Sequence, residues 1–329
     1  MIITFRTKIL IAIGIFLGVA AVAIILVLHF TPRIPPDDCT EPGQIEIHPT
    51  PETSPKPYIK WAQFDVPYDI LLKAYNYDTK SYGTDIHYNW IELLSYAVAK
   101  NYGNIDKKVA KNMDECVSLL KEGKTIDEIT SNLKYYPFYH EVYNSILGGF
   151  LQDGALKVYS PIAKGYYFNH YEDFGNVRSY GYNRKHLGND LLGSVGTPII
   201  AVEDGTIEAM GWNQFGGWRV GIRSGDGRRY YYYAHLRKDH PFNNKFKVGD
   251  TVKAGEVVGY LGRSGYSAKE GVNNIDTPHL HFGLQLIFDE SQKEGNNQIW
   301  VDVYNIVNLL NKNRSEVIYD EPTKEWNKK

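Results

Sequence analysis

Four histidines and one aspartate, spread over three short segments, offer the residue types that bind a metal ion and transfer protons. The segments are His186-Leu-Gly-Asn-Asp190, Tyr233-Ala-His235 and His279-Leu-His281. A catalytic zinc ion takes three protein ligands, from imidazole nitrogen and carboxylate oxygen, and keeps one position for water. Two of the histidines and the aspartate meet that count, which leaves two histidines to handle protons. The sequence has no H-E-x-x-H motif, so a glutamate base of that type is not expected.

The spacing within the second and third segments predicts which side chains lie together. In an extended strand, side chains two residues apart are on the same side. His279 and His281 are therefore expected to project together, and Leu280 to face the core. The same alternation places His235 on one face with Tyr233.

The three segments lie in a stretch, 152–311, whose pattern is typical of an all-β unit. Glycines recur between short runs of β-branched and aromatic residues, and such spacing predicts strands joined by tight turns. The runs are 197–202, 206–210, 218–223, 229–234, 257–261 and 279–286. A helix is expected at 303–310, and the charged tail 312–329 is expected to fray.

Residues 61–151 have a helical pattern and no catalytic constellation. Capping-box signals begin two of the expected helices, at Asn89 and Thr125. Another helix is predicted over 107–121, because apolar residues recur at helical spacing and Gly123 follows. We expect a small helical domain here, whose partner no motif identifies.

The N-terminal segment predicts a membrane anchor. Residues 9–30 are almost wholly apolar, and Arg6 and Lys8 precede them. A helix of this length spans a bilayer, and the positive charges keep the tip at 1–8 in the cytoplasm. A cleaved signal peptide is the competing interpretation, but the apolar run is longer than the usual signal core. Residues 31–60 are rich in proline and are expected to form an extended linker. Both interpretations place the body of the protein outside the cytoplasm.

Composition narrows the class of protein further. A net charge of −2 gives no basic excess, so a nucleic-acid partner is not expected. Cys39 and Cys116 form no C-x-x-C pair, so no thiolate metal site is expected. Cys116 has the spacing of a buried thiol, and a disulfide between the two cysteines is the less favoured alternative. The 26 tyrosines suit either a groove for polar polymers or a tyrosine-rich strand surface.

Taken in order, the motifs resemble those of the lysostaphin-like (M23) family of zinc endopeptidases. The matching text includes His186-Leu-Gly-Asn-Asp190, Gly196-Thr-Pro-Ile-Ile-Ala201, Tyr233-Ala-His235-Leu236, Val248-Gly-Asp-Thr-Val-Lys-Ala-Gly255 and Pro278-His-Leu-His-Phe282. The resemblance implies that one zinc ion is held by His186, Asp190 and His281. It also implies that His235 and His279 are the catalytic histidines.

The same resemblance implies a fold class. The catalytic unit of that family is an antiparallel β-sandwich of two sheets with the site in an open groove. The chain as a whole is then expected to be α+β. A transmembrane helix precedes a small helical domain, and the all-β catalytic domain follows.

The resemblance also implies peptidoglycan stem peptides as the substrate. An anchor, a helical insert and this β unit together are similar to sporulation-linked members that cut the L-Ala–D-Glu bond in cell-wall or spore-wall remodelling. Cleavage of a cross-link or another bond, and a zinc-containing scaffold without activity, stay open as alternatives. The residues expected to contact substrate are Tyr233, Arg178, Arg184 and Arg219.

Two departures from the family pattern bear on which bond is cut. Gly283 stands where many relatives have glutamate, and about ten residues, 268–277, lengthen the loop before Pro278. Both are expected to lie beside the groove.

Overall fold

The computed structural model describes residues 59, 62–180, 182–293 and 297–329. The predicted cytoplasmic tip, the anchor at 9–30, most of the linker, and Cys39 with its pairing lie outside these described residues. Within the described residues, no helix is both long and apolar enough to cross a membrane. Residues Pro57–Lys329 form one compact unit.

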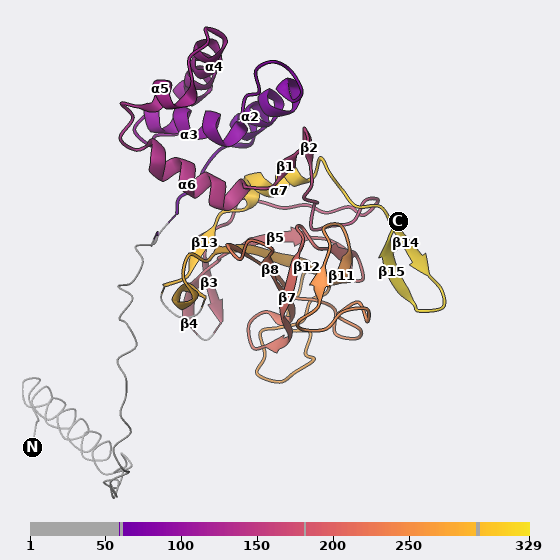
Figure 1. Cartoon of the computed structure of the whole chain (residues 1–329). Coiled ribbons are helices and arrows are strands. Elements are labelled where there is room, and N and C mark those ends of the chain that lie inside the picture. The colour runs from indigo at the N-terminus through magenta and orange to yellow at the C-terminus, as the bar shows by residue number, and fades with distance from the viewer. Residues whose placement is uncertain (1–58, 60–61, 181, 294–296) are drawn as a thin grey trace, which may run out of the picture. The chain divides into compact units, whose positions relative to one another are not determined.

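Helices α2 to α6 occupy the first part of the described chain (Figure 1). Their bounds are α2 Tyr68–Ser81, α3 Trp90–Lys100, α4 Lys107–Lys121, α5 Ile126–Thr130 and α6 Tyr136–Leu147. Asn89 caps α3 through its side chain, and Thr125 forms a full capping box with Glu128 at α5. The predicted bounds of α4 are confirmed. Cys116 is buried on this helix, and burial raises the pKa of its thiol to about 12.

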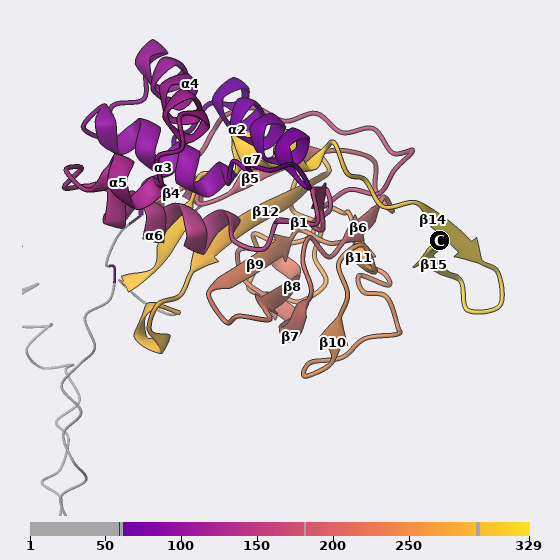
Figure 2. The same ribbon diagram turned by 45° about the horizontal axis from the view of Figure 1, so that its top comes forward.

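The strands that follow are built around one seven-stranded sheet. Its order is β10-β7-β8-β9-β12-β13, and β5 also pairs with β12. The bounds are β5 Asn189–Leu192, β7 Gly205–Asn213, β8 Gly217–Ser224, β9 Arg229–Ala234, β10 Thr251–Val252, β12 His279–Leu286 and β13 Ile299–Val301. Every pairing in this sheet is antiparallel, and Figure 2 shows β7, β8 and β9 side by side. The expected mixture of helices and antiparallel sheet is confirmed, and β9 and β12 have their predicted bounds.

Short antiparallel pairs complete the described strands. They are β1 Leu151–Gln152 with β2 Ala155–Leu156, β3 Val177–Tyr180 with β4 Tyr182–Lys185, β6 Pro198–Ile200 with β11 Val257–Tyr260, and β14 Val317–Asp320 with β15 Glu325–Lys328. A 3₁₀ turn, η1 Glu290–Gln292, lies between β12 and β13.

The C-terminal tail does not fray, and the prediction that it does is wrong. Residues 317–328 form the β14–β15 hairpin. Glu325 is buried, accepts a hydrogen bond from the Tyr260 hydroxyl, and accepts another from the Asn244 backbone N–H at 3.0 Å. A charged sequence therefore becomes ordered because a few of its residues reach partners on β11 and on the loop between β9 and β10.

One hydrophobic core joins the helices to the sheet. Buried residues of α3 and α6 belong to the same apolar cluster as Tyr231 on β9 and Phe282 on β12. Helix α7 (Tyr304–Leu310), which follows β13, contacts α2. The face of the sheet that carries Tyr231 and Phe282 is thus covered, and the groove described below lies on the opposite face.

Candidate metal centre and groove

The pairing of β5 with β12 brings together two of the three segments that carry chemistry. The register places Asp190 directly opposite His281, and His186 lies on the turn that enters β5. Gly188 makes this possible, because a Cβ atom at that position would lie 2.7 Å from the His281 imidazole. The glycine in His186-Leu-Gly-Asn-Asp190 is therefore required by the close approach of a ring 93 positions away.

The side chains of His186, Asp190 and His281 converge on one point. His186 Nε2 lies 2.9 Å from both Asp190 Oδ1 and His281 Nδ1, and His281 Nδ1 lies 3.0 Å from Asp190 Oδ1. Bonds of about 2.0–2.1 Å in a tetrahedral zinc site separate ligand atoms by roughly 3.3 Å. Three donor atoms of the right kind at nearly this spacing fit a zinc ion.

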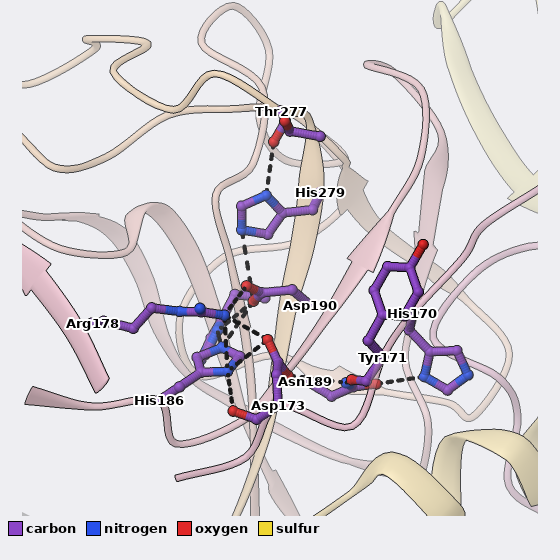
Figure 3. A network of polar contacts seen from close by, with 10 residues as sticks. His170, Tyr171, Asp173, Arg178, His186, Asn189, Asp190, Thr277 and His279 are labelled. Atoms are coloured by element: carbon purple, nitrogen blue, oxygen red, sulfur yellow. Dashed lines mark hydrogen bonds and ion pairs between the residues drawn. The ribbon is translucent and has the colours of Figure 1, made fainter. Parts of the chain in front are cut away.

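A second layer of contacts orients the candidate metal ligands His186 and Asp190 (Figure 3). His186 Nδ1 lies 3.2 Å from a carboxylate oxygen of Asp173, which fixes the proton on Nδ1 and turns Nε2 towards the metal position. Arg178 donates from Nη2 to Asp173 and, at 3.1 Å, to Asp190 Oδ2. The Asp190 carboxylate therefore has one oxygen held by Arg178 and the other directed at the two histidines.

The remaining two histidines present the same ring atom to the site. His235 Nδ1 lies 2.9 Å from the Ser264 carbonyl, and His279 Nδ1 lies 2.8 Å from the Thr277 carbonyl. A carbonyl only accepts, so each Nδ1 carries the proton and each Nε2 is the basic nitrogen. His279 Nε2 lies 3.6 Å from Asp190 Oδ1. The centroids of the His235 and His279 rings lie 4.9 Å apart.

The electrostatics of the site favour neutral imidazoles around an ionised carboxylate. Burial raises the pKa of Asp190, but the hydrogen bonds from His186 and His281 outweigh it and hold that pKa well below its usual range. Burial lowers the pKa of His235 well below its ordinary value, and it lowers the pKa of His281 as well. Neutral imidazoles are the form that binds metal and accepts protons.

A groove of about 690 Å³ extends from this centre over the exposed face of the sheet. The register of β12 and β9 pairs Gly283 with Tyr232 and Gln285 with Tyr230. Each such step lies about 7 Å further from His281. The floor therefore runs from the metal position past Tyr232 to Tyr230, and Trp300 of β13 borders it.

Tyr233 does not lie in the groove, so its predicted contact with substrate is wrong. It is fully buried in the core, and its hydroxyl accepts a hydrogen bond from the Val202 backbone N–H. Tyr232 takes the groove position, with its ring 5.9 Å from that of His281. The alternation rule fails at His235 because β9 ends at Ala234 and His235 has a φ of +63°, which turns its side chain to the face of Tyr232. His279 and His281 do share a face, as predicted.

The predicted arginines separate into two kinds. Arg178 directs Nη2 to Asp173 and Asp190 and is not among the residues that line the groove, so its contact with substrate stays a prediction. Arg184 and Arg219 both line the groove.

Of the two departures from the family pattern, Gly283 lies beside the groove as expected, whereas no residue of the loop 268–277 lines it. A Cβ atom at Gly283 would lie 2.7 Å from the Trp300 ring, so the glycine allows this tryptophan to cover the sheet at the groove's edge. The loop 268–277 leads from Tyr266, which also lines the groove, to the catalytic strand β12. Neither Asp173 nor Trp300 lies in a recognisable motif, and strand alternation counted back from His235 selects Tyr233 instead of Tyr232.

Comparison with known proteins finds similarity in this region. Peptidase family M23 matches residues 184–296. The chain is 38% identical over 124 residues to the L-Ala–D-Glu endopeptidase of Bacillus subtilis, which covers 38% of this chain and 36% of that protein. It is 43% identical over 98 residues to the glycyl-glycine endopeptidase ALE-1 of Staphylococcus capitis, covering 30% and 24%.

Among solved structures, a candidate glycyl-glycine endopeptidase, lytM, from Ruminococcus gnavus has a similar fold. The TM-score is 0.56 at 24% identity, and the alignment covers 79% of this chain and 94% of that one. The matches to the two curated relatives above span about a third or less of those proteins' lengths.

Proposed function

Because the model of peptidase family M23 matches residues 184–296, we propose that this protein is a zinc-dependent endopeptidase that hydrolyses the stem peptides of peptidoglycan. The observation that carries the proposal is the joint geometry of five side chains. His186, Asp190 and His281 converge as metal ligands, His235 lines the groove beside them, and His279 Nε2 lies 3.6 Å from Asp190 Oδ1. A scaffold without activity would have no use for those two further histidines.

The proposed role of each residue follows from these contacts. A zinc ion bound by His186, Asp190 and His281 would supply an activated water and polarise the scissile carbonyl. His235 and His279, each with Nδ1 held by a backbone carbonyl, accept and donate protons at Nε2 and stabilise the oxyanion. Tyr232 and Trp300 form apolar surface along which an extended peptide lies.

We further propose that the bond cut is L-Ala–D-Glu, in remodelling of the cell wall or spore wall. The support is the 38% identity to an L-Ala–D-Glu endopeptidase and the presence of arginines in the groove. Single-pass membrane attachment, with the catalytic part outside the cytoplasm, remains part of this proposal and rests on the apolar segment 9–30.

Mass spectrometry of purified peptidoglycan incubated with the protein, with and without a zinc chelator, tests the proposal. We expect chelator-sensitive release of peptides that begin with glutamate and leave single alanines on the glycan. Activity should return when zinc is added back.

The other outcomes separate the alternatives. Chelator-sensitive cleavage at a cross-link would keep the zinc endopeptidase and change its bond. Absence of cleavage by protein with one bound zinc ion would contradict the proposed activity and favour a scaffold.

A further inference from the structure

Arg184 occupies an unusual position in the groove. It is the penultimate residue of β4, two positions before the ligand His186. Its guanidinium lies between two aromatic rings, 5.0 Å from the centroid of Phe215 and 4.9 Å from that of Tyr266. Contact with two rings restricts the orientation of the guanidinium.

Two donors of the Arg184 guanidinium have no hydrogen-bond partner in the described chain. Nε and Nη2 of Arg184 are shielded from solvent and make no hydrogen bond with any residue that the structure describes. Leaving a buried charged donor unpaired carries a free-energy cost that a bound acceptor removes. The site is therefore incomplete without a ligand that brings an acceptor.

No carboxylate of the groove can serve as that acceptor. Among the described lining residues, the carboxylates are Asp190 and Glu208. Asp190 is held by its histidines and Arg178, and Glu208 pairs with Arg223 and Lys293. The described residues therefore offer Arg184 no free carboxylate, and a planar carboxylate of a bound ligand matches Nε and a terminal nitrogen as a bidentate pair.

The position of Arg184 says where on the substrate this carboxylate lies. Tyr266, one of the two rings in contact with it, also packs on His235 with the centroids 5.6 Å apart. Only the Tyr266 side chain therefore lies between Arg184 and His235, the histidine proposed to act on the reacting bond. A carboxylate held there belongs to a residue next to that bond.

We propose that Arg184 is a specificity-determining residue that binds a free carboxylate on the substrate residue adjacent to the scissile bond. This rests on the proposed endopeptidase function and deepens it. A glutamate residue has two carboxyl groups, and a chain uses only one, so an alanine–glutamate bond has a free carboxylate beside it. A glycine–glycine bond has none. Arg184 therefore selects acidic stem peptides over glycine bridges.

Arg219 is the weaker candidate for the same task. It lines the groove and forms no ion pair with a described residue, but only its Nε is shielded and unpaired. No aromatic ring among the described residues restricts the orientation of its guanidinium. It is the natural comparison for Arg184.

The test compares two synthetic stem peptides with the full zinc-loaded chain. One has L-alanine linked to D-glutamate with its free carboxylate, and the other has that carboxylate converted to an amide. We expect kcat/KM for the acid to exceed that for the amide by about 10- to 100-fold, as for loss of a hydrogen bond to a charged group. Arg184→Gln should remove this preference by lowering only the rate on the acid, and Arg184→Lys should restore a part of it.

A charge-matched control is Lys269→Gln, since Lys269 is exposed on the same loop as Tyr266 and does not line the groove. This variant should keep the full preference for the acid. Calorimetric binding of the glutamate-initiated product peptide and its amide to the same proteins gives a readout independent of turnover. Arg184→Gln should weaken binding of the acid alone.

The outcomes are distinguishable. Equal loss on both peptides in Arg184→Gln, or no preference in the parent protein, would overturn the role of Arg184 while cleavage itself keeps the proposed function. Failure of the parent protein to cleave either peptide would count against the proposed function. Calorimetry would then still decide the Arg184 role, because binding that ignores the carboxylate overturns it.

Discussion

The histidines of the site differ in the partners of their ring nitrogens, and their proposed roles follow from this difference. His186 directs Nε2 at the metal position because Asp173 holds its Nδ1. His235 and His279 have Nδ1 on backbone carbonyls, and neither is needed to complete a three-ligand zinc site. Mutations can therefore distinguish loss of zinc binding from loss of proton transfer.

Replacing either proton carrier is expected to abolish turnover while zinc stays bound. His279→Ala, and His235→Asn, which tolerates the left-handed backbone at that position, should lower kcat by about 100- to 10,000-fold. Metal analysis of the purified variants should still give one zinc per chain.

His186→Ala is the contrasting variant, because it removes a ligand and should lose both zinc and activity. Loss of zinc from His279→Ala would show that His279 is a ligand and reassign its role.

At the scale of the elements, an arginine on β9 ties the sheet to the helices. Arg229 is buried and donates to both carboxylate oxygens of Glu203 at 2.8 Å and to the Ser145 carbonyl of α6 at 2.9 Å. The Tyr231 hydroxyl donates to the same Glu203 at 2.6 Å. The strand that carries groove residues is therefore fixed to α6 through a satisfied ionic network.

Arg229→Met should lower the free energy of unfolding by about 3–5 kcal/mol, because it leaves the Glu203 carboxylate, whose side chain is only 16% exposed, without its counter-ion. Urea unfolding followed by circular dichroism measures the change. Arg228→Met is the matched control, since Arg228 is exposed and should change stability by no more than about 0.5 kcal/mol. Equal effects of the two variants would contradict the network's importance.

Across the whole molecule, the abundance of tyrosine has a consequence for stability in alkali. Burial raises the pKa of Tyr230 to about 12, and desolvation, aided by Asp114, raises that of Tyr77 to about 12. Burial also raises the pKa of Tyr231 well above its ordinary value. The folded protein keeps phenol protons that the unfolded chain releases near pH 10, at about the unperturbed value.

Stability should therefore be complete below about pH 10 and fall as the pH rises towards about 12. For Tyr230 the free energy of unfolding should fall by about 1.4 kcal/mol per pH unit inside that window. Urea titrations at successive pH values, run on the parent protein and on Tyr230→Phe, isolate this contribution. Parallel curves for the two proteins between these pH values would disprove it.

The sequence by itself determined what local spacing controls. Helix α4, with its caps and breakers, and strands β9 and β12 have their predicted bounds, because residues within a few positions decide those features. Strand alternation also predicted that His279 and His281 lie on the same face of their strand. The motif order resembled a family whose model matches residues 184–296.

Only the tertiary structure decided what depends on contacts between distant residues. Because the backbone at His235 is left-handed, His235 shares the groove face with Tyr232 and not with Tyr233. Strand alternation predicts nothing beyond Ala234, the last residue of β9. Asp173 and Arg178 became supports of the metal ligands only when the β3–β4 hairpin folded beside β5. Glu325 ordered the C-terminal hairpin for the same reason, because its partners lie 65 and 81 positions away. Burial and partnership are properties of the packed chain, and no local pattern encodes them.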